Sequence, residues 1–240
     1  MAEPDGGPVA AGTPDRSSTG TYQPSARTQV RRHRERGRYD RAEVHAILDE
    51  GFLCHVACVV DGAPWMIPTI YARRGDELLL HGAAANHVLG AICDGAPLVA
   101  TVTLVDGLVL ARSVMHHSIN YRSVVVFGQG TEVTDPVDKE AALALVVDHL
   151  LPGRTAEARP PTPSELRATR VVSVPLDEVS AKVRTGAPVD DDADLALPVW
   201  AGVLPIGLVA GPPEPDGLGV GAADLPAGFD QPGRWWSAIE

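Results

Sequence analysis

The strongest constraint on the fold of this chain is a series of short β-branched segments joined by tight turns. Asp61-Gly62 and Asp106-Gly107 each stand between two apolar runs, and Asp-Gly is a strong signal for a hairpin turn. Strands are therefore expected at residues 52–60, 64–72, 77–81, 98–105, 108–114 and 120–133. Meandering strands joined by hairpins favour a closed or nearly closed antiparallel barrel.

Helices are expected to flank these strands at residues 40–50, 82–93 and 137–150. Asp40 and Asp135 stand where the first and third of these helices need an N-cap. Two late strands are expected, at 170–176 and 178–184. No GxGxxG motif leads from a strand into a helix, which disfavours a doubly wound dinucleotide fold. The predicted fold class is mainly β, an antiparallel barrel with flanking helices.

The two ends of the chain differ in composition from its middle. Residues 1–26 are rich in Gly, Pro, Ser and Thr, and such a segment is expected to be disordered. Residues 185–240 are rich in Pro, Gly and Asp but carry Trp200, Trp235 and Trp236. We expect this C-terminal extension to pack on the barrel, which is assigned to residues 27–184.

The charge and cysteine content narrow the possible partners and compartments. A net charge of -11 disfavours nucleic acid as a partner. A local basic run is interpreted as a solvated arm, with an anion-contacting arm as the alternative, and it contains Arg27, Arg31, Arg32, Arg34, Arg36, Arg38 and Arg41. Three cysteines indicate a reducing cytoplasm rather than a disulfide framework. No apolar run is long enough for a bilayer, and no secretory leader is recognised, so we expect no membrane partner.

Polar side chains are unusually dense between Leu110 and Gly128, where hydroxyls, imidazoles, an amide, a phenol and guanidiniums stand between β-branched runs. Polar groups within a sheet are costly unless they are paired, so this segment predicts a polar ligand. His116 and His117 are adjacent and would face opposite sides of a strand. No acidic or cysteine partner stands nearby at ligand spacing, so no metal site is predicted.

Several stretches, taken in order, carry a family resemblance. They are Arg38-Tyr-Asp40, Cys54-His-Val-Ala57, Asp61-Gly-Ala-Pro64, Ile67-Pro-Thr-Ile-Tyr71, Leu80-His-Gly82, Asp106-Gly-Leu-Val-Leu-Ala-Arg112, His117-Ser-Ile-Asn-Tyr-Arg-Ser123 and Val199-Trp-Ala-Gly-Val-Leu-Pro205. The chain resembles the pyridoxamine 5'-phosphate oxidase-like superfamily of FMN-binding split barrels. Within it, the chain is most similar to the flavin-nucleotide-binding branch that includes the nitroimidazole-resistance proteins.

The resemblance implies a homodimer with two FMN sites at the subunit interface. It places Pro68, Thr69, Ile70 and Tyr71 along the isoalloxazine, with His81 and Gly82 beside them. Asn86 and His87 would begin the short helix near the phosphate. A later strand would line the site with Asn120, Tyr121, Arg122 and Ser123, and Arg122 is expected to be the phosphate cation. His81 is the candidate to donate a proton or position a substrate.

The chain departs from this branch at residues 83–85, where alanines replace the usual serine, and at His87, which stands near the usual basic residue. The departure favours weaker FMN binding, a phosphate held by Arg122 and the N-terminal arginines, or a changed cofactor. The function expected from the resemblance is an FMN-dependent oxidoreductase acting on a small organic substrate. The alternatives are a flavin-binding protein without turnover, such as a sensor, and a split barrel that binds haem or a deazaflavin.

Overall fold

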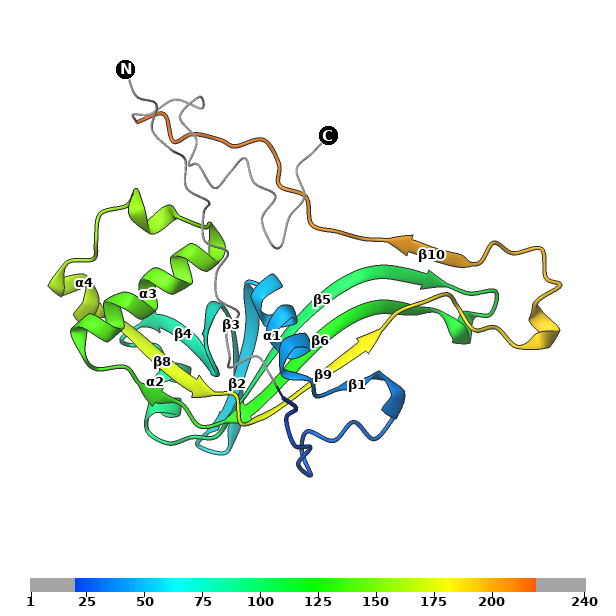
Figure 1. The fold of residues 1–240 in the computed structure, drawn as a ribbon, viewed down its shortest axis with the longest axis horizontal. Helices are drawn as coiled ribbons and strands as arrows, with labels where there is room; N and C mark the ends of the chain where they lie inside the picture. Colours follow the sequence, from blue (N-terminus) through cyan, green and yellow to red (C-terminus); the bar gives the residue numbers. More distant parts are fainter. Residues whose placement is uncertain (1–19, 219–240) are drawn as a thin grey trace, which may run out of the picture.

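A computed structural model of the protein describes residues 20–218 (Figure 1). The strands are Gly37–Arg38 (β1), Leu53–Val60 (β2), Ala63–Arg74 (β3), Glu77–Ala83 (β4), Leu98–Leu110 (β5), Ser118–Gly128 (β6), Thr131–Glu132 (β7), Thr169–Pro175 (β8), Glu178–Arg184 (β9) and Gly202–Pro205 (β10). The α-helices are Arg41–Glu50 (α1), His87–Cys93 (α2), Pro136–Leu150 (α3) and Pro163–Ala168 (α4). Short 3-10 turns occur at Arg34–Arg36 (η2), Val114–His116 (η3), Arg154–Ala156 (η4) and Asp192–Asp194 (η5).

The strands form one antiparallel system in the order β1-β9-β6-β5-β2-β3-β4-β8-β7, with β10 paired to β5. Residues 63–70 of β3 pair with β2, whereas residues 71–74 pair with β4. A single long strand therefore passes from one half of the barrel to the other. This arrangement, with helices around it, confirms the predicted antiparallel split barrel.

The two Asp-Gly pairs have different structural roles. Asp61 and Gly62 both have positive φ, 51° and 78°, and close the β2–β3 hairpin as predicted. Asp106 and Gly107 instead lie inside β5, at a register shift between Val105 and Gly107. A Cβ at Gly107 would lie 3.0 Å from the Leu204 carbonyl oxygen of β10. Glycine at this position lets two backbones approach closely, so the predicted second hairpin turn is wrong.

The buried core lies between the inner face of the barrel and its helices. Asp40 caps α1 by accepting from the Glu43 amide at 3.0 Å, and Asp135 caps α3, as the sequence predicted. The inner face of β2 carries Cys54 and Cys58, which are buried free thiols. A second apolar cluster seats α3 against β3, β4 and β8. The expected cytoplasmic location, which rested on the sparse cysteines, stays a prediction.

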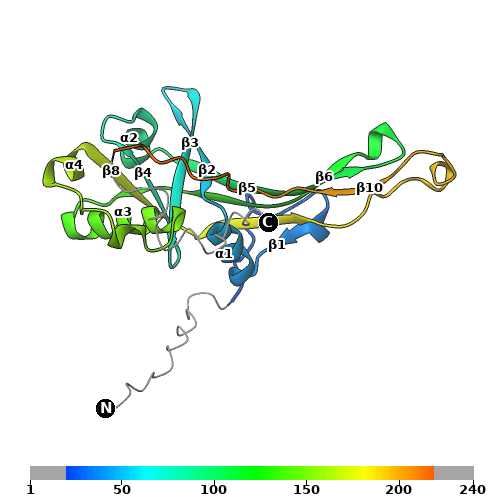
Figure 2. The ribbon, with the colours of Figure 1, turned by 90° about the horizontal axis from the view of Figure 1, so that it is seen from above.

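Strands β5, β6 and β9 extend beyond the barrel as a long arm, which Figures 1 and 2 show from two sides. Strand β10 of the C-terminal extension lies along this arm, where it pairs with residues 107–110 of β5. At the other end of the chain, residues 20–26 belong to the segment predicted to be disordered, yet Tyr22 is buried and its amide donates to the Tyr39 carbonyl at 2.8 Å. Residues 1–19 of that segment, with Trp235 and Trp236, lie outside the described residues.

None of the helices within residues 20–218 is both long and apolar enough to cross a membrane.

Candidate functional site

The split of the barrel leaves two strand edges without a neighbouring strand in the part of the chain that the structure describes. Pairing between β3 and β4 ends at Tyr71 and Leu80. Beyond that point residues 63–70 pair only with β2, and residues 81–83 pair only with β8. Pro68 fits such an edge, because proline has no amide hydrogen to contribute to a second ladder. The free backbone groups at these edges can bond a flat heterocycle that carries donors and acceptors.

His81 lies at the mouth of this split. Its Nδ1 atom is buried without a hydrogen-bond partner, and burial lowers the pKa of the imidazole. Its carbonyl accepts from the Thr69 hydroxyl across the split at 3.3 Å. His81 is therefore a neutral histidine at neutral pH, with one ring nitrogen unsatisfied at a free strand edge. An unpaired buried nitrogen of this kind is available to a bound ligand.

The first turn of α2 is organised mainly by structural contacts. The Asn86 side chain accepts from the Leu89 amide at 3.0 Å and so serves as the N-cap. His87 packs edge-on against Trp65, with ring centroids 5.0 Å apart. A Cβ at Gly82 would lie 2.9 Å from Leu89 Cδ1. Glycine at 82 thus lets Leu89 of α2 pack closely against β4, and the close ligand approach that the sequence indicated stays a prediction.

Tyr71 belongs to the core and its side chain cannot line a ligand site. The residue is fully buried, and its hydroxyl donates to the Leu48 carbonyl at 2.7 Å. Its ring also lies 5.4 Å from that of His149. The strand turns the Tyr71 side chain inward, so only the backbone of this residue can run along a cofactor, as the resemblance implied. Pro68, Thr69 and Ile70 keep their place at the free edge.

The polar residues of β6 are engaged with other side chains of this chain. The Arg122 guanidinium lies between two carboxylates and donates to Asp106 at 2.7 Å and to Glu50 at 2.6 Å. These contacts raise the pKa of Arg122, so it remains charged, but its charge is already balanced. The predicted role of Arg122 as the phosphate cation does not fit this arrangement, because two carboxylates would repel a phosphate there.

Asn120 also has a structural role that the sequence did not indicate. Its amide nitrogen donates to the Gly186 carbonyl at 3.2 Å, and its side-chain oxygen accepts from Arg184. These contacts fix the end of β9. Tyr121 and Ser123 lie on the opposite face of β6 and are half-buried. Strands β5 and β2 separate all of these residues from the split, so one chain does not bring the two predicted sets of site residues together.

The outer face of the barrel between these two sets is largely apolar and exposed. Leu53, Val59 and Met66 are 42%, 57% and 62% exposed on this face. His55 stands among them on β2, opposite Pro68 of β3 and Thr101 of β5. It is exposed, and none of the described residues hydrogen-bonds to its ring. A contiguous apolar surface with a single imidazole is unusual for solvent-facing sheet and typical of a covered surface.

Two arginines that sequence reasoning missed belong to segments that lie beside the turn before α2. The Ala84 amide donates to the Ala168 carbonyl at 2.8 Å, which places this turn beside the exposed Arg167. Arg170 is the cross-strand partner of Gly82 and also contacts Glu132 at 3.3 Å. Arg167 belongs to α4 and Arg170 to β8. Both elements are far from residues 82–87 in the sequence, so no local pattern could link them to that turn.

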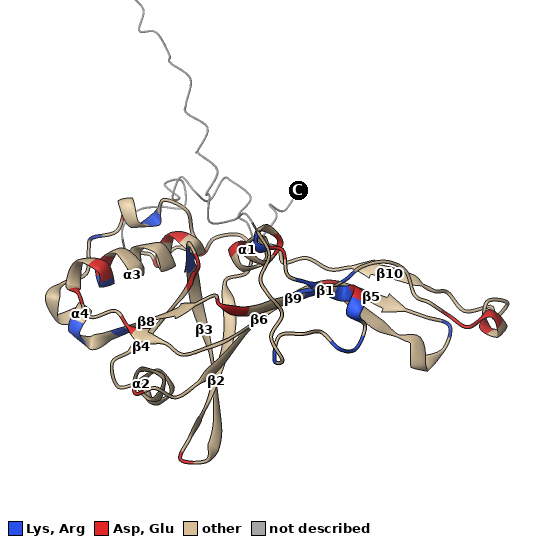
Figure 3. Ribbon diagram, turned by 60° about the horizontal axis from the view of Figure 1, so that its bottom comes forward, with Lys and Arg blue, Asp and Glu red and all other residues tan. Residues whose placement is uncertain are grey.

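The N-terminal arginines gather beside β1 and β9, as Figure 3 shows. Several are paired with acidic groups. Arg27 contacts Glu178 and lies over the Phe127 ring, with 5.2 Å between guanidinium carbon and ring centroid. Arg38 contacts Glu43 at 3.3 Å, and Arg41 contacts Asp76. This arrangement agrees with a solvated arm laid on the barrel.

The chain is similar to a known protein family and to solved structures. A family model described as pyridoxamine 5'-phosphate oxidase matches residues 40–183. No curated protein matches the chain. Among solved structures, the flavocytochrome Anf3 from Azotobacter vinelandii is 41% identical, with a TM-score of 0.80, and the match covers 87% of this chain and 96% of that one.

Two further solved structures are similar to this chain. An FAD- and haem-binding protein from Mycobacterium smegmatis is 36% identical, with a TM-score of 0.77, over 81% of this chain and 96% of that one. A protein described as a 5-nitroimidazole antibiotic resistance protein from Bacteroides thetaiotaomicron is 21% identical, with a TM-score of 0.51, over 60% of this chain and 84% of that one. The last of these shares the fold.

Proposed function

This chain belongs to the pyridoxamine 5'-phosphate oxidase family, and from that premise we propose that it binds both a flavin and a haem and acts as an oxidoreductase. The proposal rests on the extent of the likeness to two relatives, a flavocytochrome and an FAD- and haem-binding protein. Each match covers more of the chain than residues 1–183 could supply, so it reaches past the family model into the C-terminal extension. The likeness to the 5-nitroimidazole resistance protein covers only 60% of this chain.

The split of the barrel fits the flavin. The free edges at residues 66–70 and 81–83 offer backbone groups to the pyrimidine part of the ring, and His81, whose Nδ1 has no hydrogen-bond partner, belongs to the second of these edges. Arg167 is the exposed basic residue beside the following turn and supports a phosphate there. A bound flavin would supply hydride or single-electron transfer, and the chain's residues would orient it and hold protons near it.

The exposed outer face fits a haem. A macrocycle needs a flat apolar surface and an axial ligand, and the face beside Leu53 and Met66 presents the free imidazole of His55. We propose that the His55 imidazole would hold the haem iron. When bound, the haem would supply one-electron chemistry next to the flavin site, with Pro68 of β3 and His55 of β2 as cross-strand neighbours.

We further propose that the working form is a homodimer. The split-edge residues and Tyr121 and Ser123 of β6 are separated by two strands within one chain, so they can contact one ligand only if a second copy supplies one set. The exposed apolar residues of the outer face support the same arrangement, because burying them removes apolar surface from water. Met66→Arg should then shift sedimentation from dimer to monomer, whereas Val137→Arg, at an exposed position on α3, should not.

The absorbance spectrum of the purified full-length chain tests the two-cofactor proposal. We expect flavin bands together with a haem Soret band. His55→Ala should lose the haem band and keep the flavin bands, whereas His117→Ala, which alters another exposed imidazole, should keep both. If the protein shows flavin bands but no haem band, even after reconstitution with haem, it binds a flavin only and the haem part of the proposal is wrong. If the haem band survives in His55→Ala, His55 does not hold the haem.

Chromatography of the heat-released flavin identifies its form. FAD is expected from the likeness to the FAD- and haem-binding relative, whereas FMN is what the sequence resemblance implied. Reduction of the bound flavin by NADH or NADPH, followed by reoxidation with small organic acceptors, separates an oxidoreductase from a sensor without turnover. A deazaflavin would be distinguished by its own absorbance bands.

A further inference from the structure

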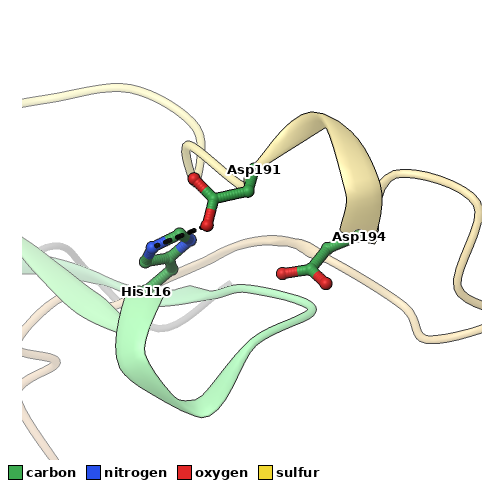
Figure 4. Close-up of side chains that lie close together, drawn as sticks. All are labelled: His116, Asp191 and Asp194. Carbon is green, nitrogen blue, oxygen red and sulfur yellow. Dashed lines mark ion pairs between the residues drawn. The ribbon is translucent and has the colours of Figure 1, made fainter.

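A cluster of three metal-ligating side chains lies at the tip of the arm, away from the split. His116 belongs to η3, between β5 and β6, while Asp191 and Asp194 come from the C-terminal extension at η5. One ligand atom from each residue, an imidazole nitrogen or a carboxylate oxygen, lies within 4.8 Å of the other two. Figure 4 shows the imidazole and both carboxylates directed toward a common space. Local spacing alone gave His116 no acidic partner, but the fold supplies two.

The His116 ring has no hydrogen bond from the described residues. Its Nδ1 is buried without a partner, and its Nε2 is 3.9 Å from Asp191 Oδ2, which is too long for a hydrogen bond. A buried ring nitrogen without a partner is uncommon in folded proteins. The ring is therefore free to give a lone pair to a cation, and no other contact would have to be broken.

Hydrogen bonds hold the backbone that carries the two carboxylates. Asp190 accepts from the Arg112 amide at 2.8 Å and from its guanidinium at 2.9 Å, which fixes the extension on the end of β5. The Asp194 amide donates to the Asp191 carbonyl at 2.9 Å. Residues three apart in such a turn project to the same side, so both carboxylates face the imidazole.

The charges of the cluster are unbalanced without a cation. Arg112 is matched by Asp190, while none of the lysines or arginines in residues 20–218 pairs with Asp191 or Asp194. The two carboxylates carry two negative charges, which a divalent cation would balance. An imidazole nitrogen with carboxylate oxygens suits zinc and similar transition metals better than calcium or magnesium. Metal–ligand bonds of about 2.0–2.2 Å would draw the three groups slightly closer together.

We propose that His116, Asp191 and Asp194 bind a divalent transition-metal ion, with water completing its coordination. The ion would tie the C-terminal extension to the tip of the arm, across segments that are distant in sequence. This site is separate from the proposed flavin and haem sites, and it does not depend on either of them.

Zinc titration of the chelator-treated, full-length protein by calorimetry tests the proposal. We expect one zinc ion per chain at this site, and a fall in its affinity of about tenfold or more in His116→Ala and in Asp194→Asn. The matched controls are His117→Ala, whose exposed ring contacts the Ser113 carbonyl, and Asp192→Asn in the same 3-10 turn. Both controls should bind zinc as the unaltered protein does.

Limited proteolysis supplies a second readout on the same samples. Zinc should slow cleavage of residues 186–201 in the unaltered protein and in the controls, but not in Asp194→Asn, which changes a surface carboxylate and should leave the fold intact. Absence of zinc binding in the unaltered protein would overturn the proposal. Equal affinity in Asp194→Asn and Asp192→Asn would overturn it as well, since the ion would then lie elsewhere.

Discussion

At the scale of single residues, side chains that look alike in the sequence differ in their partners. His45, His81 and His116 each have a buried Nδ1 without a hydrogen-bond partner, but the other ring nitrogen of His45 bonds the Tyr22 hydroxyl at 3.0 Å. His81 lies at the free edges of the split, and His116 lies beside two carboxylates. The same residue type therefore points to a flavin in one place and to a metal ion in the other.

The lowered pKa of His81 predicts how stability depends on pH. Burial holds its folded-state pKa below the usual value of about 6.5, so the unfolded chain binds the proton more readily. This contribution to stability is complete above about pH 6.5 and is lost as the pH falls toward the folded-state pKa. The urea midpoint of unfolding should therefore decrease as the pH is lowered from about 7.5 to about 5.5. In His81→Gln this decrease should be smaller.

Some of the pH dependence should remain in His81→Gln, because burial lowers the pKa of His45 as well. An unchanged slope in His81→Gln would mean that His81 has the same proton affinity in the folded and unfolded states, contrary to its buried position.

Arg122→Ala should lower stability more than it lowers flavin affinity. Removing the guanidinium leaves Glu50 and Asp106 facing each other without a cation, at a half-buried position. We expect a loss of about 1–3 kcal/mol in the free energy of unfolding, measured by urea denaturation of the cofactor-free chain. Unchanged stability with a flavin affinity at least tenfold weaker would restore the phosphate role assigned from the sequence.

At the scale of elements, neighbouring strands overrode two local patterns. The alanines at 83–85 favour helix, and the sequence predicted one over residues 82–93. In the structure β4 continues to Ala83 because it pairs with β8, and α2 begins only at His87. In the same way, β5 continues through Asp106-Gly107, with a register shift but no turn, because β6 and β10 pair with it on both sides.

The junction between β6 and β7 gives a test of packing at this scale. A Cβ at Gly130 would lie 2.4 Å from Val172 Cγ1 and 2.6 Å from Ile92 Cγ2, both in the core between β8 and α2. Gly130→Ala should therefore cost about 1–3 kcal/mol, since those elements must move apart. A Cβ at Gly128 meets nothing closer than 3.5 Å, so Gly128→Ala should stay within about 0.5 kcal/mol. Equal urea midpoints for the two variants would contradict this packing.

At the scale of the whole molecule, the C-terminal extension contacts the arm, and its strand β10 lies outside the main core of the barrel. Strand β10 pairs only with residues 107–110 of β5, and none of its residues belongs to the main core cluster. The arm also carries the cluster at His116, and the extension supplies its carboxylates. The barrel's apolar contacts lie among β2, β3, β4, β5, β6, β8 and β9 with α1 and α2.

Ending the chain at Ala201 should therefore loosen the arm and leave the barrel intact. Without β10, one edge of residues 107–110 becomes free, and we expect faster amide hydrogen exchange in a peptide covering residues 105–112. A peptide from β2, covering residues 54–60, is the internal control and should keep its protection. Faster exchange in both peptides would show that the extension stabilises the barrel as well.

The sequence by itself determined the features whose causes are local. The Asp61-Gly62 turn and the caps of α1 and α3 follow from neighbouring residues, whose dihedral preferences need no distant partner. The residues at the split edges, Pro68, Thr69, Ile70 and His81, also came from the sequence, through a resemblance.

Only the tertiary structure decided which polar groups are free and which are already paired. Arg122 meets Glu50 and Asp106, Asn120 meets Arg184, and His116 meets Asp191 and Asp194, in every case across a distance in sequence that no spacing rule records. Side-chain charges act over a few ångströms of space, irrespective of sequence separation. Asn120 and Arg122 of β6, which looked like part of the wall of a ligand site, are for this reason engaged in structural contacts, while the tip of the arm carries a candidate metal site that the sequence did not predict.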